Sequence, residues 1–189
     1  MNNQQDFLKR IIEKLQTAEI SYMISGSLGS SFHGRPRTTN DIDMVIESDE
    51  KKLMTFVHSL GDGYYVSEDA ARKALLNTAT FNIVDFSSGY KADIIVRKKR
   101  AFSREEFERR KPVEILGGHF YIVSAEDSIL SKLEWARKGE SERQFNDAVG
   151  VAEVQWGNLN IDYLKKWAKE LDLVALLDRL ITEVQKLQT

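Results

Sequence analysis

The first 123 residues mix two hydrophobic periods, that of an amphipathic helix and that of a strand. Apolar residues at helical spacing predict helices, and alternating or short continuous apolar runs predict strands. Helices are expected over residues 6–18, 50–60 and 68–77, with a short helix or turn over 28–33. Strands are expected over residues 21–25, 41–47, 80–86 and 91–96, and a hairpin that turns at Gly117-Gly118 over 114–123.

From Ser124 onward the pattern is helical throughout. The stretches Ser124 to Asp127 and Ser141 to Gln144 each place a hydroxyl three residues before an acid or amide, as in a capping box at a helix start. Two further amphipathic helices are expected over residues 161–171 and 173–187. The chain is therefore predicted to be an α+β protein, with an α/β domain over residues 1–123 and an all-helical domain over 124–189.

Composition narrows the class of protein. The 189 residues carry a net charge of −2 and no cysteine, so disulfides, zinc–thiolate sites and cysteine nucleophiles are excluded. No apolar run approaches membrane-spanning length and the N-terminus lacks a signal-peptide core, so a cytoplasmic protein is expected. A net charge this close to zero argues against a protein that binds nucleic acid over most of its surface. Of two basic runs, 33–37 and 97–100, the second is expected to be a solvated loop.

The strand expected over residues 41–47 carries two acids in an otherwise apolar run. Because side chains on a strand alternate between faces, Asp41 and Asp43 point to one side, and Ile42 and Met44 to the other. Two carboxylates this close repel unless a cation lies between them, and such pairs suit Mg²⁺ or Mn²⁺. An alternative is equally open at this point: Asp41 merely begins the strand, and Asp43 faces water on a one-sided sheet.

The residues ahead of this strand favour the metal-site interpretation. Gly26 and Ser27 follow a hydrophobic strand and precede a helix-like turn. Backbone N–H groups and a hydroxyl at such a junction suit an anionic phosphate. A phosphate site followed by paired carboxylates points to a nucleotide and its metal ion more strongly than either feature alone.

A third carboxylate is expected from a later strand. Asp93 is embedded in the run Lys91 to Val96 as Asp43 is in its own strand, and it is the candidate for activating an attacking hydroxyl. Asp85 is the competitor for this position. Since Asp85 lies close to the turn Ser87-Ser88-Gly89, it is expected to be a turn or edge residue.

Three stretches together resemble the nucleotidyltransferase superfamily of the DNA polymerase β type. They are GSLGSSFHGRPRTTNDIDMVIE, FNIVDFSSGYKADIIV and SAEDSILSKLEWARKGESERQFNDA, within residues 21–149. The first stretch joins Gly-Ser, across thirteen residues, to an Asp-hydrophobic-Asp-hydrophobic strand. The details look closer to a minimal bacterial branch, the AbiEii-like proteins of type IV toxin–antitoxin systems.

The resemblance implies a nucleotidyltransferase-type core with a mixed sheet, and it assigns roles by position. Gly26 and Ser27 would hold the nucleotide phosphates. Asp41 and Asp43 would bind the metal ions, Mg²⁺ or Mn²⁺. Asp93 would complete the catalytic and metal-binding triad and assist the acceptor.

Basic residues of the first and third stretches have weaker assignments. Lys132 matches a position where such proteins often place a basic residue near the triphosphate, and the alternative is a surface lysine. Arg37, just ahead of the carboxylate strand, is expected to meet phosphate or acceptor. Arg35 and His33 are weaker candidates, because loop residues of this type are usually solvated. Asp147 is expected to be a helix-surface or ion-pairing residue.

The function expected from this resemblance is transfer of a nucleoside monophosphate from an NTP to an acceptor hydroxyl. The acceptor stays open between an RNA 3′ end, a protein and a small molecule. The enzyme would be a toxin if an antitoxin partner accompanies it. The alternative is a module on the same fold that binds a nucleotide or a partner without useful turnover.

Overall fold

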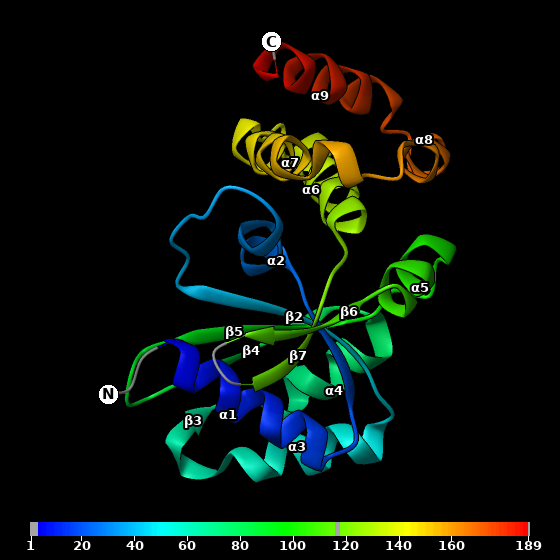
Figure 1. Ribbon diagram of the computed structural model, residues 1–189. Helices are drawn as coiled ribbons and strands as arrows, with labels where there is room; N and C mark the ends of the chain where they lie inside the picture. The colour runs from blue at the N-terminus through cyan, green and yellow to red at the C-terminus, as the bar shows by residue number, and fades with distance from the viewer. Residues whose placement is uncertain (1–3, 116–117, 189) are drawn as a thin grey trace. The chain divides into compact units, whose positions relative to one another are not determined.

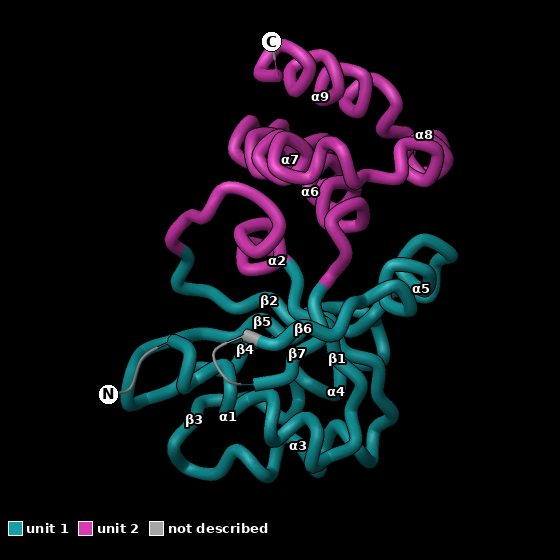
Figure 2. The backbone as a smooth tube through the Cα atoms, in the orientation of Figure 1, with its two compact units in different colours: residues 1–25, 39–122 teal, residues 26–38, 123–189 magenta. Residues whose placement is uncertain are grey.

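A computed structural model describes residues 4–115 and 118–188, and Figure 1 shows their helices and strands. The chain groups into two compact units, coloured separately in Figure 2. Unit 1 contains residues 1–25 and 39–122, and unit 2 contains residues 26–38 and 123–189. The domain boundary after residue 123 is a prediction from sequence pattern. The two units differ from this prediction in residues 26–38, which group with unit 2.

The described part of unit 1 contains a seven-stranded sheet in the order β3-β4-β5-β2-β1-β7-β6. Its strands are β1 (Ser21–Ile24), β2 (Asp41–Glu47), β3 (Tyr64–Tyr65), β4 (Thr80–Asp85), β5 (Lys91–Val96), β6 (Lys111–Ile115) and β7 (Gly118–Ile122). The sheet is mixed, because β2 pairs in parallel with β5 and antiparallel with β1. The two parallel neighbours therefore begin at the same edge of the sheet.

Helices α1 (Gln4–Thr17), α3 (Glu50–Leu60) and α4 (Glu68–Asn77) lie together on one side of this sheet in Figure 1. They cover its apolar face, on which the side chains of Ile42, Met44 and Ile46 are fully buried. Helix α3 begins where the side chain of Asp49 accepts a hydrogen bond from the N–H of Lys52. The alternate positions of β2 face the other way and carry the polar residues considered below.

Unit 2 is helical. It comprises α2 (Gly26–His33), α6 (Ala125–Gly139), α7 (Glu142–Gln155), α8 (Ile161–Glu170) and α9 (Val174–Leu187). The predicted helix starts at Ser124 and Ser141 are confirmed, since each hydroxyl accepts a hydrogen bond from the N–H three residues later. Gly34, just after α2, allows close packing on α7, because a Cβ there would lie 2.7 Å from backbone atoms of Val151.

The predicted α+β class, with a mixed sheet followed by helices, is confirmed. The prediction missed helix α5 (Ala101–Glu108) and the two-residue strand β3. In α5 the buried residues Phe102 and Phe107 are separated by charged residues in a segment too short for a clear helical period. The turn residue Gly117 of the expected hairpin lies outside the described residues. No described helix combines the length and apolar character that crossing a bilayer requires.

Candidate functional site

The parallel pairing of β2 and β5 brings the three predicted carboxylates onto one face of the sheet. In the register, Asp43 is paired with Asp93, and Asp41 with Lys91. Paired residues of neighbouring strands point to the same side, and so do residues two apart on one strand. We refer to this group, Asp41, Asp43, Lys91 and Asp93, as the carboxylate face.

Lys91 is a member of this group that sequence analysis did not single out. Its Nζ lies 3.1 Å from Oδ1 of Asp93. This contact with Asp93 raises the pKa of the Lys91 ammonium above its usual value, against the opposing effect of burial, and the charges of Asp93, Asp41 and Asp43 raise it further. The signal was available in the sequence, because Lys91 precedes Asp93 by two residues in the same strand.

The carboxylate face fits a divalent cation in its chemistry. Carboxylate oxygens are the hard ligands that Mg²⁺ and Mn²⁺ prefer, and Asp43 and Asp93 occupy directly paired positions. Within residues 4–115 and 118–188, no three His, Asp or Glu side chains are already gathered closely enough to hold a metal ion.

Asp85 belongs to the opposite face of the sheet. Asn82 of β4 is paired with Asp93, and Asp85 lies three positions further along β4, so its side chain points away from Asp93. It is 3 % exposed, lies 2.6 Å from Arg10 Nη2, and accepts hydrogen bonds from the N–H and Oγ of Ser87 at 2.8 and 2.7 Å. Burial would raise the pKa of the Asp85 carboxyl, but the Ser87 hydrogen bonds and the Arg10 charge hold it below its usual range. Asp85 is thus a structural turn residue.

Helix α2 begins at the predicted Gly26-Ser27 junction. The backbone N–H of Ser25, the last residue before it, donates to the carbonyl of Asp43 at 2.9 Å. Gly26 has a φ of 58°, in the left-handed region that glycine adopts more readily than residues with a Cβ. Ser27 follows as a buried residue of the first turn.

Within unit 2, two cations meet one carboxylate. Arg37 Nε donates to Oδ1 of Asp147 at 3.1 Å, and its Nη2 donates to the Ser27 hydroxyl. Lys132 Nζ donates to Oδ2 of Asp147 at 2.8 Å and to Oε1 of Gln144 at 2.9 Å. We refer to these five residues as the Asp147 cluster.

The cluster decides between the alternatives left open for Lys132 and Asp147. Lys132 is 5 % exposed, so the alternative of a surface lysine is wrong. Asp147, expected on the helix surface or in an ion pair, is the shared partner of both cations. Gln144 and Asp147 lie three residues apart on α7, and this spacing was the available sign that both face α6.

The two basic runs are less exposed than their composition suggests. His33 is buried, with Nε2 2.6 Å from the carbonyl oxygen of Val123, so it is not a solvated loop residue. Arg35 is largely exposed and forms an ion pair with Glu153. In the second run, Arg97 is mostly covered and pairs with Glu47, so the expectation of a solvated loop fails for this residue.

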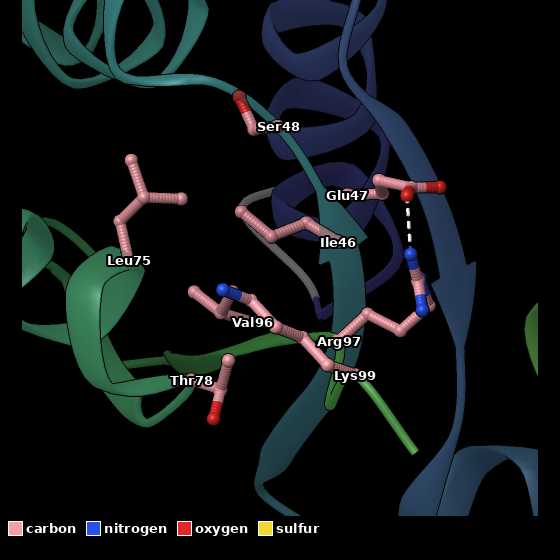
Figure 3. A pocket seen from close by; sticks show the side chains of 8 residues that line it. All are labelled: Ile46, Glu47, Ser48, Leu75, Thr78, Val96, Arg97 and Lys99. Carbon is pink, nitrogen blue, oxygen red and sulfur yellow. Dashed lines mark hydrogen bonds and ion pairs between the residues drawn. The ribbon is translucent and has the colours of Figure 1, made fainter. Parts of the chain in front are cut away.

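A cavity of about 260 Å³ lies at the other end of the β2 and β5 pair (Figure 3). The residues that line this cavity lie where β2 and β5 end, whereas Asp41, Asp43 and Asp93 lie near the start of these strands. The lining residues are Ile46, Glu47, Ser48, Leu75, Thr78, Val96, Arg97 and Lys99. In Figure 3 the guanidinium of Arg97 is directed to Glu47, so its charge is already paired. None of the predicted site residues lines this cavity.

Comparison with solved structures identifies the fold. A nucleotidyltransferase-like protein from Paracoccidioides brasiliensis, described as antigenic, matches with a TM-score of 0.60 and 15% identity over 93% of this chain and 86% of that one. The lincosamide antibiotic adenylyltransferase LnuA, with lincomycin bound, matches at 0.55 and 13% over 82% and 99%. ANT(2″)-Ia in complex with adenylyl-2″-tobramycin matches at 0.54 and 14% over 93% and 98%.

No protein-family model and no curated protein matches the sequence. At these identities the likeness to solved structures establishes shared architecture. The resemblance to the AbiEii-like branch stays a prediction. The chain therefore has the fold of nucleotidyltransferases.

Proposed function

We propose that this protein is a metal-dependent nucleotidyltransferase. It transfers a nucleoside monophosphate from an NTP to an acceptor hydroxyl. The acceptor oxygen forms a bond to the α-phosphorus, the bond from this phosphorus to the bridging oxygen breaks, and pyrophosphate leaves. The observation that carries the proposal is the pairing of Asp43 with Asp93, beside Asp41, on the sheet of a nucleotidyltransferase fold.

The carboxylate face supplies the residues around the reacting phosphorus. Asp41, Asp43 and Asp93 would hold Mg²⁺ or Mn²⁺, which would neutralise charge on the phosphates and lower the pKa of an oxygen ligand. Asp93 also takes the proton of the acceptor hydroxyl. The roles of these residues are testable one at a time, because each substitution to Asn removes a charge and keeps the size of the side chain.

Unit 2, taken by itself, carries residues suited to bind a phosphate. Ser27 offers a hydroxyl in the first turn of α2, and Arg37 and Lys132 offer two charged donors held by Asp147. Gly26 keeps the start of this helix free of a side chain, so that a phosphate approaches the backbone N–H groups. Two cations on a single carboxylate leave one positive charge for an anion.

For the acceptor we propose a small hydroxyl-bearing molecule. The lincosamide antibiotic adenylyltransferase LnuA, with lincomycin bound, and ANT(2″)-Ia, in complex with adenylyl-2″-tobramycin, share this fold, and each is named with a small molecule. An RNA 3′ end and a protein hydroxyl are the competing acceptors. The protein would act as a toxin, with an antitoxin partner, if its acceptor were a molecule that the cell needs in unmodified form.

The test is incubation with each α-labelled NTP, Mg²⁺ or Mn²⁺, and separate fractions of small molecules, total RNA and protein. We expect label in the small-molecule fraction, and no label in any fraction with Asp41→Asn. Label in RNA or protein would reassign the acceptor and keep the reaction. Metal-dependent NTP binding without pyrophosphate release would favour the non-catalytic module.

Two companion measurements locate the phosphate site and the biological role. Ser27→Ala should weaken NTP binding by about 1–3 kcal/mol, since one hydrogen bond to a charged group is lost. Unchanged NTP affinity in Ser27→Ala would move the phosphate site elsewhere. If the protein is a toxin, its expression should slow growth, and Asp41→Asn should remove this effect.

A further inference from the structure

Lys91 occupies a special position among the charged residues of unit 1. It stands two residues before Asp93 on β5 and is paired in the register with Asp41 on β2. Its side chain is 33 % exposed and that of Asp93 is 23 % exposed, so the ion pair between them is partly covered. The pair of Lys73 and Asp69 on α4 is an ordinary surface ion pair by contrast, with both side chains more than two thirds exposed.

Three carboxylates that share one face of a sheet repel each other. The repulsion disfavours the folded state unless positive charge is close to them. The Lys91 ammonium lies 3.1 Å from Asp93 and supplies such a charge from within the sheet. A lysine suits this position, because its ammonium is a compact charge on a flexible stem that can leave one partner for another.

We propose that Lys91 is a positioning residue, which holds the Asp93 carboxylate and offsets the charge of Asp41 and Asp43 until a divalent cation displaces it. This inference rests on the proposed function, in which these carboxylates hold the metal ion. It adds that metal binding is an exchange of one cation for another. The exchange keeps Asp93 ordered in the metal-free protein at the expense of metal affinity.

The exchange predicts that one substitution lowers the stability of the metal-free protein and raises its affinity for the metal ion. Lys91→Gln removes the charge and keeps a side chain of similar length. Without metal the variant should unfold about 1–3 °C below wild type, as expected for loss of a partly covered ion pair in a chain of this size. With metal it should bind Mn²⁺ about three- to tenfold more tightly, because no ammonium has to leave.

The binding experiment uses the full-length protein and Mn²⁺ alone, followed by calorimetry and by the loss of the free Mn²⁺ electron paramagnetic resonance signal. Lys99→Gln is the matched control, because it removes the same charge from an exposed lysine at the far end of the same two strands. Lys91→Arg keeps the charge and should bind Mn²⁺ as wild type does. Should Lys91→Gln fail to fold, Lys91→Met is measured in the same way.

Tighter Mn²⁺ binding by Lys91→Gln, with Lys99→Gln unchanged, supports the proposal. Equal or weaker binding by Lys91→Gln overturns it. Failure of the proposed function has a different signature: Asp43→Asn would then bind Mn²⁺ as tightly as wild type. Loss of binding in Asp43→Asn together with unchanged binding in Lys91→Gln would therefore overturn the role of Lys91 alone.

A double-mutant cycle in the presence of a chelator tests the metal-free half of the proposal. Lys91→Gln and Asp93→Asn are made singly and together, and the thermal unfolding of all four proteins is compared. If Lys91 holds Asp93, Lys91→Gln lowers the unfolding temperature in the wild-type background and has little effect beside Asp93→Asn. Equal effects in both backgrounds overturn the holding role.

Discussion

The carboxylate face of unit 1 and the Asp147 cluster of unit 2 are built from similar side chains in opposite proportions. On the carboxylate face, three aspartates share one side of the sheet with Lys91. In the Asp147 cluster, Arg37 and Lys132 share one aspartate. The first group has an excess of negative charge, and the second has an excess of positive charge.

The difference matters because groups of like charge are costly to bring together without a partner. An excess of carboxylates suits a divalent cation, and an excess of guanidinium and ammonium groups suits a phosphate. Asp85, on the opposite face of the same sheet, shows what a carboxylate with a structural role looks like, since Arg10 and Ser87 already satisfy it.

The largest expected effect is on the carboxylate face. Asp43→Asn should lower turnover by more than about a hundredfold, because loss of a metal ligand costs more than loss of a residue that only supports one. Pyrophosphate release in the presence of Mg²⁺ measures the effect. Asp85→Asn is the control from the other face and should keep most of the turnover. Near-normal turnover in Asp43→Asn would contradict the proposal that the carboxylate face binds the metal ion.

A slightly smaller effect is expected in the Asp147 cluster. Asp147→Asn leaves Arg37 and Lys132 without their carboxylate and should lower the free energy of unfolding by about 2–4 kcal/mol. Urea denaturation without phosphate measures this change, and added pyrophosphate should restore part of it by replacing the missing negative charge.

Asp172→Asn is the matched control for this change. Its carboxylate also pairs with an arginine, Arg137, but its side chain is 96 % exposed. Its substitution should change the free energy of unfolding by no more than about 0.5 kcal/mol. Equal effects of the two substitutions would show that the Asp147 cluster is an ordinary surface network.

The packing that supports the Asp147 cluster is the third point to test. Gly34→Ala places a Cβ within 2.7 Å of the Val151 backbone and should lower the free energy of unfolding by about 1–3 kcal/mol. Arg37 lies three residues after Gly34, so a shift of this segment should displace Arg37 and weaken NTP binding as well. Gly139→Ala is the control, because a Cβ there meets nothing within 4 Å. If both variants are as stable as wild type, α2 is not held closely on α7.

The smallest effect is expected at Asp85. Asp85→Asn should lower the free energy of unfolding by about 1–2 kcal/mol at pH 7. The pKa of this carboxyl is lower in the folded protein than its usual value, so its contribution is present above about pH 4 and is lost as the pH falls through the folded pKa. Urea denaturation at pH 7 and pH 3 should therefore show a difference from wild type that shrinks in acid. A difference that grows in acid would contradict the assigned ion pair.

Much of the fold could be predicted from local pattern. The strands over 41–47 and 91–96 and the helices over 50–60 and 68–77 have the predicted bounds, because their apolar periods and caps are clear. Helix α5 and strand β3 were missed because short elements carry too few apolar positions to show a period. The candidate site was predicted where an acid interrupts a buried strand, as at Asp43 and Asp93.

The rest of the candidate site could not be predicted, because it depends on which residues meet across elements. Lys91 had no predicted role, and Asp147 was predicted to lie on the helix surface or in an ion pair, without its two partners. The register of β2 with β5 and the packing of α7 on α6 bring these residues to their partners. His33 was expected to be exposed by its loop composition and is buried by tertiary packing.

Local sequence pattern was enough to predict which residues alternate on each strand, where most helices begin, and that acids lie within buried strands. These are local properties, since they follow from the period of the backbone and from capping by neighbouring residues. Contacts between distant segments settled what the local pattern left open: Lys91 is paired with Asp41, and Lys132 and Arg37 meet on Asp147. Strand register and helix packing depend on contacts between distant segments, and the burial of the whole apolar face selects them.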